Sequence, residues 1–126
     1  MPQELILIIE DNEKNRKLIR DLLQAKGYQT IESDSAEQGI KRAAESKPTL
    51  VLMDIQLPDM DGITALKQLK AEPATHSIPV MAITASAMTH NRETMLAEGF
   101  DGYQTKPFNL TEFLADVARL VNQNRS

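Results

Sequence analysis

The sequence predicts an α/β fold, a doubly wound parallel sheet of five strands in the order 2-1-3-4-5 with helices on both faces. Three observations support it. Short apolar runs recur along the chain, each bounded by polar or turn-forming residues. Stretches with helical spacing lie between them, so strand and helix alternate five times. Right-handed crossovers place such helices on both faces of a sheet, and five units favour this strand order.

The strand candidates are the short apolar runs. Continuous apolarity suits a strand that helices cover on both faces of the sheet. Three runs have this character, 5–9, 50–53 and 78–83. Two weaker candidates are 28–32, which alternates as an edge strand does, and 102–105.

The first three helix candidates carry recognisable caps. Asn12 can cap the first helix, and Gly27 stands where a left-handed C-terminal residue is expected. Ser35 with Gln38 makes a weak capping box for the second helix. Asp61 can cap the third.

Two further helices complete the pattern. The fourth is expected over 87–98 and ends at Gly99. Its apolar stripe is poor, so we expect a weakly held helix. The fifth begins at Asn109 or Thr111 and is the clearest, because apolar residues follow at spacings of three and four.

Composition narrows the classes of function. The 126 residues suit one domain, and 41% are hydrophobic, 25% are charged and none is cysteine. The net charge of -4 gives no basic surface for nucleic acid, and the lack of cysteine excludes a disulfide framework and thiolate metal sites. The first apolar run is too short for a signal peptide or a membrane span. We expect a cytoplasmic protein, without nucleic-acid or membrane partners.

Charged side chains gather at the predicted carboxyl ends of the strands. Glu10 and Asp11 follow the first strand, Asp54 follows the third, and Lys106 follows the fifth. Strands 1 and 3 are neighbours in the predicted order, and ligands of such sheets bind at this switch point. Carboxylates about 4 Å apart repel by roughly 4 kcal/mol per pair at an effective dielectric constant near 20. A divalent cation would offset that charge, and oxygen ligands favour Mg²⁺.

The same edge offers ligands for a phosphoryl group. Lys106 supplies an ammonium and Thr84 a hydroxyl, so a phosphoryl group held by both and by Mg²⁺ would have its charge offset. Asp54 is then the natural nucleophile and would form an acyl phosphate. The alternative for an isolated acid is a helix cap or a solvated loop residue. We assign Asp61 to a cap and Asp59 to a solvated loop.

These residues resemble the receiver domains of two-component response regulators over essentially the whole chain. The matching segments are LILIIEDN, VLMDIQLPDMDG, PVMAITA and the pair Lys106 and Pro107. The segments EDNEKNRKL, MDIQLPDMDG and TASAM look closest to the DivK-like cell-cycle regulators and to the receivers attached to hybrid kinases. The resemblance implies a flavodoxin-like (βα)5 fold. Because only the polar residues 122–126 follow the fifth helix, we expect a stand-alone domain over 1–126 without an output domain, as a monomer or weak dimer.

The resemblance also implies the chemistry of the site. Asp54 would accept a phosphoryl group from a phosphohistidine on a sensor histidine kinase or a histidine phosphotransfer protein. Mg²⁺ would be bound by Asp11, Asp54 and the backbone carbonyl of Gln56. Glu10 would help through a water molecule. Such a domain catalyses only its own phosphorylation and dephosphorylation.

The remaining family positions concern the phosphoryl group and the switch. Lys106, Thr84 and the backbone N–H of Ala85 would contact the phosphoryl oxygens, and a cis peptide before Pro107 would aim the lysine. Thr84 and Tyr103 match the switch pair. Thr84 would move towards the phosphoryl group and Tyr103 would turn inward, which would reshape the face of helix 4, strand 5 and helix 5 for a downstream protein.

Three other functions remain open. The domain could pass the phosphoryl group to a histidine phosphotransfer protein as a relay intermediate. A haloacid-dehalogenase-like phosphatase needs a second aspartate two residues after the nucleophile, where Gln56 stands. A flavodoxin-like nucleotide binder needs a first loop rich in glycine, serine and threonine, whereas EDNEKN brings carboxylates.

Overall fold

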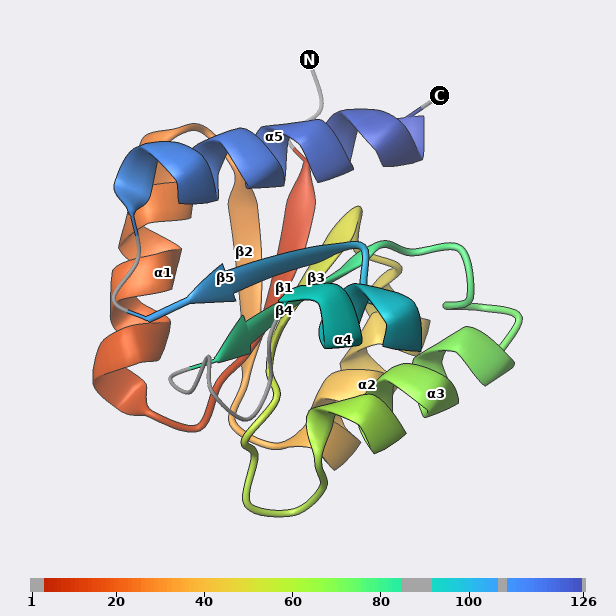
Figure 1. Ribbon diagram of the computed structural model, residues 1–126. Helices are drawn as coiled ribbons and strands as arrows, with labels where there is room; N and C mark the ends of the chain where they lie inside the picture. Colours follow the sequence, from red (N-terminus) through yellow and green to blue (C-terminus); the bar gives the residue numbers. More distant parts are fainter. Residues whose placement is uncertain (1–3, 85–91, 107–108, 126) are drawn as a thin grey trace.

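The strands form one parallel sheet in the order β2-β1-β3-β4-β5, as predicted (Figure 1). This computed structural model describes residues 4–84, 92–106 and 109–125. The strands are β1 (Leu5–Ile9), β2 (Gln29–Ser33), β3 (Leu50–Asp54), β4 (Val80–Thr84) and β5 (Gly102–Thr105). Asp54 and Thr84 are therefore the last residues of their strands and do not follow them, so the sheet itself fixes their backbone.

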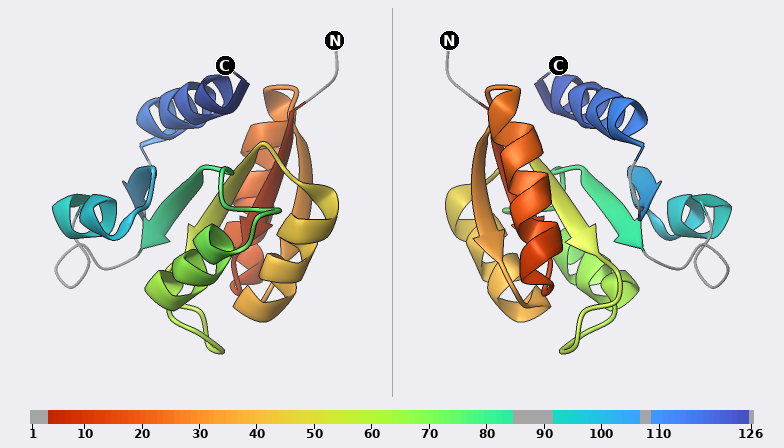
Figure 2. Two further views of the ribbon diagram at one scale, coloured as in Figure 1. Left: turned by 90° about the vertical axis from the view of Figure 1, so that its right-hand side faces the viewer. Right: turned by 90° about the vertical axis from the view of Figure 1, so that its left-hand side faces the viewer.

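The helices cover both faces of the sheet (Figure 2). They are α1 (Glu13–Ala25), α2 (Ala36–Ser46), α3 (Gly62–Ala71), α4 (Arg92–Glu98) and α5 (Leu110–Arg125). Helices α1 and α5 pack on one face, and α2, α3 and α4 pack on the other. None of the helices in the described part of the chain has the length and apolarity that a bilayer crossing requires.

Alternation along the strands builds two hydrophobic cores. In β1, Ile6 and Ile8 face α1 and α5, whereas Leu7 and Ile9 face α2 and α3. All four side chains are fully buried, as expected for a strand flanked on both sides and covered on both faces. The apolar sequence of the central strands thus reflects helices on both faces of the sheet.

The three predicted N-cap residues are present, but the predicted capping box is incomplete, because the Ser35 N–H donates to Ser33 Oγ at 3.4 Å and not to Gln38. The side chains of Asn12, Ser35 and Asp61 accept hydrogen bonds from the backbone N–H three residues later. Gly27 has a φ of 92°, in the left-handed region expected after α1. Asn109 accepts a hydrogen bond from the N–H of Glu112 at 3.1 Å, which decides between the two starts considered for α5. Of the predicted fourth helix, residues 87–91 lie outside the described residues.

Candidate functional site

The carboxylates of Glu10, Asp11 and Asp54 meet at the carboxyl ends of β1 and β3, as predicted. One oxygen from each lies within 4.8 Å of the other two. The register of β1 and β3 explains why two of them meet, because Ile9 pairs with Met53 and the residues that follow this pair are Glu10 and Asp54. Glu10 is fully buried, Asp54 is 5% exposed and Asp11 is exposed. The cluster is therefore buried on the sheet side and open to solvent at Asp11.

Lys106 brings a cation to this cluster from the end of β5. Its Nζ lies 3.1 Å from Asp54 Oδ2 and also pairs with Glu10 Oε1. The backbone N–H of Lys106 donates to the carbonyl of Thr84 at 2.8 Å, which continues the pairing of β5 with β4. The lysine side chain is only 15% exposed. The sequence predicted Lys106 as a phosphoryl ligand, and the structure shows it as the partner of two carboxylates.

These groups differ in protonation. Burial raises the pKa of Glu10 to about 7, with a further contribution from Asp54. Burial also acts to raise the pKa of Asp54, but hydrogen bonds from Glu10 and the Gln56 N–H outweigh it and hold the pKa below its ordinary value. Burial opposes the charge on Lys106, yet contact with both carboxylates raises its pKa. Near neutral pH, Asp54 is therefore ionised, whereas Glu10 is present in both its protonated and its ionised form.

The loop after β3 fixes the position of Asp54. The backbone N–H of Gln56 donates to Asp54 Oδ1 at 2.8 Å, and Gln56 forms an isolated antiparallel bridge with Asp61. The N–H of Gly62 donates to the carbonyl of Ile55 at 3.1 Å. A Cβ at position 62 would lie 2.6 Å from Ile55 Cα, so only glycine allows this approach. The DMDG segment thereby closes the loop against the strand that carries Asp54.

Asp59 corrects one prediction made from the sequence. The residue is exposed, but it is not merely a solvated loop residue. Its Oδ1 and Oδ2 accept hydrogen bonds from the backbone N–H groups of Ala36 and Glu37, both at 3.0 Å. These bonds hold the pKa of Asp59 below its ordinary value. Asp59 is a second cap for α2, supplied from a segment distant in sequence.

The two residues predicted to form the switch pair lie on the strands next to the site. Thr84 is fully buried at the end of β4, and Tyr103 on β5 is 5% exposed. The guanidinium of Arg92 lies 5.6 Å from the centroid of the Tyr103 ring, and Arg92 Nη2 donates to the Tyr103 carbonyl at 3.2 Å. Sequence reasoning did not identify Arg92. The predictions for Ala85 and Pro107 concern residues outside the described part of the chain.

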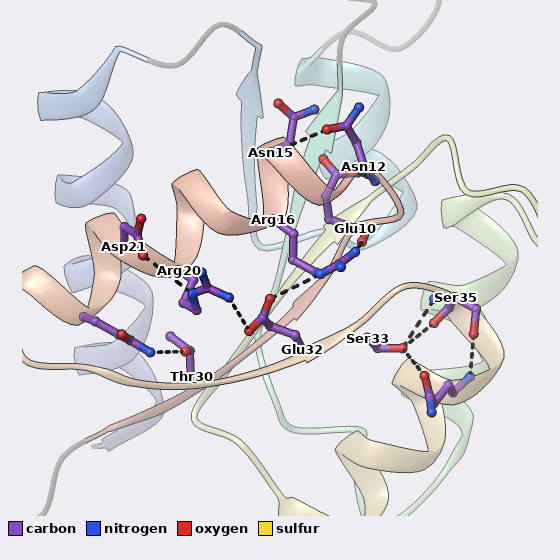
Figure 3. A network of polar contacts seen from close by, with 12 residues as sticks. Glu10, Asn12, Asn15, Arg16, Arg20, Asp21, Thr30, Glu32, Ser33 and Ser35 are labelled. Atoms are coloured by element: carbon purple, nitrogen blue, oxygen red, sulfur yellow. Dashed lines mark hydrogen bonds and ion pairs between the residues drawn. The ribbon is translucent and has the colours of Figure 1, made fainter.

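A network of polar contacts supports the cluster from the side of α1 (Figure 3). Arg16 Nη1 donates to the backbone carbonyl of Glu10 at 2.9 Å, and Arg16 Nε pairs with Glu32 Oε1 at 3.2 Å. Arg20 Nη1 pairs with the other oxygen of Glu32 at 3.3 Å. Sequence reasoning missed these residues, because their partners lie on different elements.

The donor set of the cluster suits a hard divalent cation. The three carboxylates offer oxygen ligands only, and one side of the group is open for water. Mg²⁺ prefers oxygen ligands and keeps several of its waters. The residues therefore fit this cation better than a transition metal that prefers sulfur or imidazole.

Known proteins are similar to this chain in sequence and in fold. Residues 6–118 match the family model of the response regulator receiver domain. The polar-differentiation response regulator DivK of Brucella anthropi is 40% identical over 117 residues, which are 93% of this chain and 94% of that protein. DivK of Brucella ovis is 41% identical over 112 residues, which are 89% of this chain and 91% of that protein.

Solved structures agree. The receiver domain of a sensor histidine kinase from Pseudomonas aeruginosa PAO1, with a magnesium ion coordinated in its active site cleft, is 30% identical with a TM-score of 0.87. The match covers 96% of this chain and 99% of that one. A CheY-like receiver domain protein from Methanospirillum hungatei has a TM-score of 0.88 over 98% of both chains, and its 24% identity shows the fold alone. The chain therefore belongs to the response regulator receiver domains of two-component signalling, and within them it is similar to DivK.

Proposed function

We propose that Asp54 is the phosphoacceptor and takes a phosphoryl group from a phosphohistidine on a sensor histidine kinase or a histidine phosphotransfer protein. The environment of this carboxylate carries the proposal. Asp54 is nearly buried, and its two oxygens are held by the Gln56 N–H at 2.8 Å and by Lys106 Nζ at 3.1 Å. The hydrogen bonds keep its pKa low, so it is ionised at neutral pH. A preorganised, ionised carboxylate needs little rearrangement before it attacks.

The cofactor we propose is Mg²⁺. Asp11 and Asp54 would bind it directly together with the backbone carbonyl of Gln56, while Glu10 would act through a water molecule. The full burial of Glu10 and its pairing with Lys106 support this indirect role. When bound, the ion offsets the negative charge of the phosphoryl oxygens during transfer.

Transfer of the phosphoryl group would form one bond at Asp54 and break one at the phosphohistidine. An Asp54 oxygen bonds to phosphorus as the phosphorus–nitrogen bond breaks, and the imidazole leaves with that electron pair and takes up a proton. Lys106, already beside Asp54, would follow the charge onto the phosphoryl group, joined by the Thr84 hydroxyl and the Ala85 N–H. Water later hydrolyses the acyl phosphate. The domain would thus catalyse only its own phosphorylation and dephosphorylation.

The output we propose is protein binding at the face formed by α4, β5 and α5. Thr84 and Tyr103 lie on neighbouring strands, and Arg92 connects Tyr103 to α4. Movement of Thr84 towards a phosphoryl group would therefore change the conformation of this face, and a downstream protein could bind the changed surface. A phosphorelay is the second candidate, favoured by the 30% identity to a receiver domain from a sensor histidine kinase.

Intact-mass measurement after incubation with acetyl phosphate and Mg²⁺ tests the phosphoacceptor. We expect one phosphoryl adduct on the wild type and none on Asp54→Asn. Asp59→Asn is the matched control, because it changes an exposed aspartate of the same loop and should keep the adduct. An unmodified wild type, or an equal adduct on Asp54→Asn, would refute the assignment. Label that moves from the phosphorylated protein to a histidine phosphotransfer domain would favour the relay.

A further inference from the structure

The side chain of Arg16 holds the loop that presents the two acidic residues after β1. Its Nη1 donates to the backbone carbonyl of Glu10 at 2.9 Å, and its Nε pairs with Glu32 on β2 at 3.2 Å (Figure 3). The Arg16 side chain is only 21% exposed, so water competes weakly for these bonds. One planar group thereby connects α1, β2 and the end of β1.

Arg16 also donates through its backbone. Its N–H bonds to the carbonyl of Asn12 at 2.9 Å, which begins the regular bonding of α1. The carbonyls on either side of Asp11, those of Glu10 and Asn12, therefore both accept from the same residue. Because Asp11 is exposed, these flanking bonds provide much of what fixes its backbone.

The Glu10 carbonyl has lost the partner that the sheet would normally provide. Glu10 faces β2, because its N–H donates to the Ser33 carbonyl at 3.0 Å. In a parallel ladder the Glu10 carbonyl would then accept from the N–H of Ser35. That N–H donates instead to the side chain of Ser33, at 3.4 Å. The guanidinium thus completes the hydrogen bonding of a buried peptide group.

We propose that Arg16 is a positioning residue that holds Glu10 and Asp11 in the geometry that binds a divalent cation. The inference rests on the proposed Mg²⁺ site, and it concerns cation affinity, which can be measured without phosphoryl transfer. Electrostatics alone predicts the opposite effect: removing a positive charge near carboxylates should tighten cation binding. A weaker affinity after loss of Arg16 would therefore reveal positioning.

Arg20 is the matched control. It lies one turn further along α1 and pairs with the same glutamate, through Nη1 and Glu32 Oε2 at 3.3 Å. Its other ion pair is with Asp21 on its own helix, at 3.5 Å. In the described part of the chain the contacts of Arg20 are with Glu32 and Asp21, and none is with the Glu10 carbonyl. Arg20→Ala therefore removes one charge and one Glu32 contact and leaves the loop bonded.

The experiment is a calorimetric titration of the protein with Mg²⁺. For Arg16→Ala we expect the Kd to rise about tenfold, the lower end of the loss seen when groups that orient metal ligands are removed. For Arg20→Ala we expect a Kd equal to or below that of the wild type. Arg16→Lys keeps the charge but cannot reach both acceptors, so its affinity should fall in the same direction. Urea unfolding of each variant establishes that it is folded at the titration temperature.

A second readout separates positioning from damage to the fold. At saturating Mg²⁺ the phosphorylation rate of Arg16→Ala with acetyl phosphate should approach that of the wild type, whereas at limiting Mg²⁺ it should be much lower. An unchanged or tighter Kd for Arg16→Ala overturns the proposal, as does an equal loss for Arg20→Ala. If Arg16→Ala does not fold, an unchanged Kd for Arg16→Lys overturns it. A wild type that binds Mg²⁺ without gaining a phosphoryl group would refute the proposed function alone.

Discussion

The contact of Asp59 with α2 allows a quantitative stability prediction. Its two oxygens accept from the N–H groups of Ala36 and Glu37, both at 3.0 Å. These groups lie in the first turn of α2, where a helix has no partners of its own for them. Asp59→Ala removes both bonds, while Ser35 still accepts from the Gln38 N–H at 3.3 Å. The substitution therefore tests the second cap of α2 alone.

The expected loss in the free energy of unfolding is about 1.5 kcal/mol. Losing a single helix cap costs typically about 1 kcal/mol, and here two bonds to a charged acceptor are lost, although water replaces part of them at this exposed site. For a chain of 126 residues, such a loss lowers the melting temperature by about 5 °C. Asp59→Asn keeps one acceptor oxygen and should lose about half as much.

Urea unfolding followed by circular dichroism measures both variants. Because the pKa of Asp59 is lowered in the folded state, its contribution is present above its ordinary pKa of 3.8 and is lost as the pH falls through the folded value. The wild type and Asp59→Ala should therefore converge in strong acid. The reasoning fails if Asp59→Ala unfolds within about 0.3 kcal/mol of the wild type at pH 7, or if Asp59→Asn loses as much as Asp59→Ala.

Three further predictions follow from the site. Gly62→Ala should lower the free energy of unfolding by about 3 kcal/mol in urea, because its Cβ would lie 2.6 Å from Ile55 Cα; a neutral effect would contradict the close approach. Burial raises the pKa of Glu10 from 4.5 to about 7, so the folded state binds this proton more tightly than the unfolded state does. Protonation of Glu10 therefore stabilises the folded state by up to about 3 kcal/mol, and this contribution is complete below pH 4.5. That stability is lost as the pH rises through about 7, and Glu10→Gln should flatten this part of the urea-unfolding profile; parallel profiles would contradict it. Arg92→Ala should cost about 1 kcal/mol and shift the NMR ring protons of Tyr103, since the guanidinium lies 5.6 Å from the ring centroid; unchanged shifts would exclude that contact in solution.

Much of the fold was predictable because it depends on short-range patterns. The apolar runs identified the strands, and the caps at Asn12, Ser35 and Asp61 identified the starts of three helices. The meeting of Glu10 with Asp54 also followed, because strand order alone brings the ends of β1 and β3 together. Each of these needs only local periodicity or the topology of the sheet.

The contacts that sequence reasoning missed depend on the reach of individual side chains. Asp59 is 23 residues from Ala36, and nothing in LPDMDG indicates that its carboxylate turns towards another helix. Arg16 looks like an ordinary exposed residue of an amphipathic helix until the positions of Glu10 and Glu32 are known. Rotamers and distances between elements decide such contacts, and periodicity contains no information about them.

The pairing of Lys106 with two carboxylates has a consequence for the order of folding. Lys106 is 96 residues from Glu10 and 52 from Asp54, so the ammonium arrives only when β5 docks on β4. Before that step, a sheet of the first four strands would bury the carboxyl groups of Glu10 and Asp54 side by side without a cation from the protein. Their repulsion and desolvation would make this four-stranded intermediate less stable. Docking of the last strand relieves that repulsion. The pair of acids that serves the site therefore also makes the partly folded chain less stable than the complete one, which sharpens the cooperativity of folding.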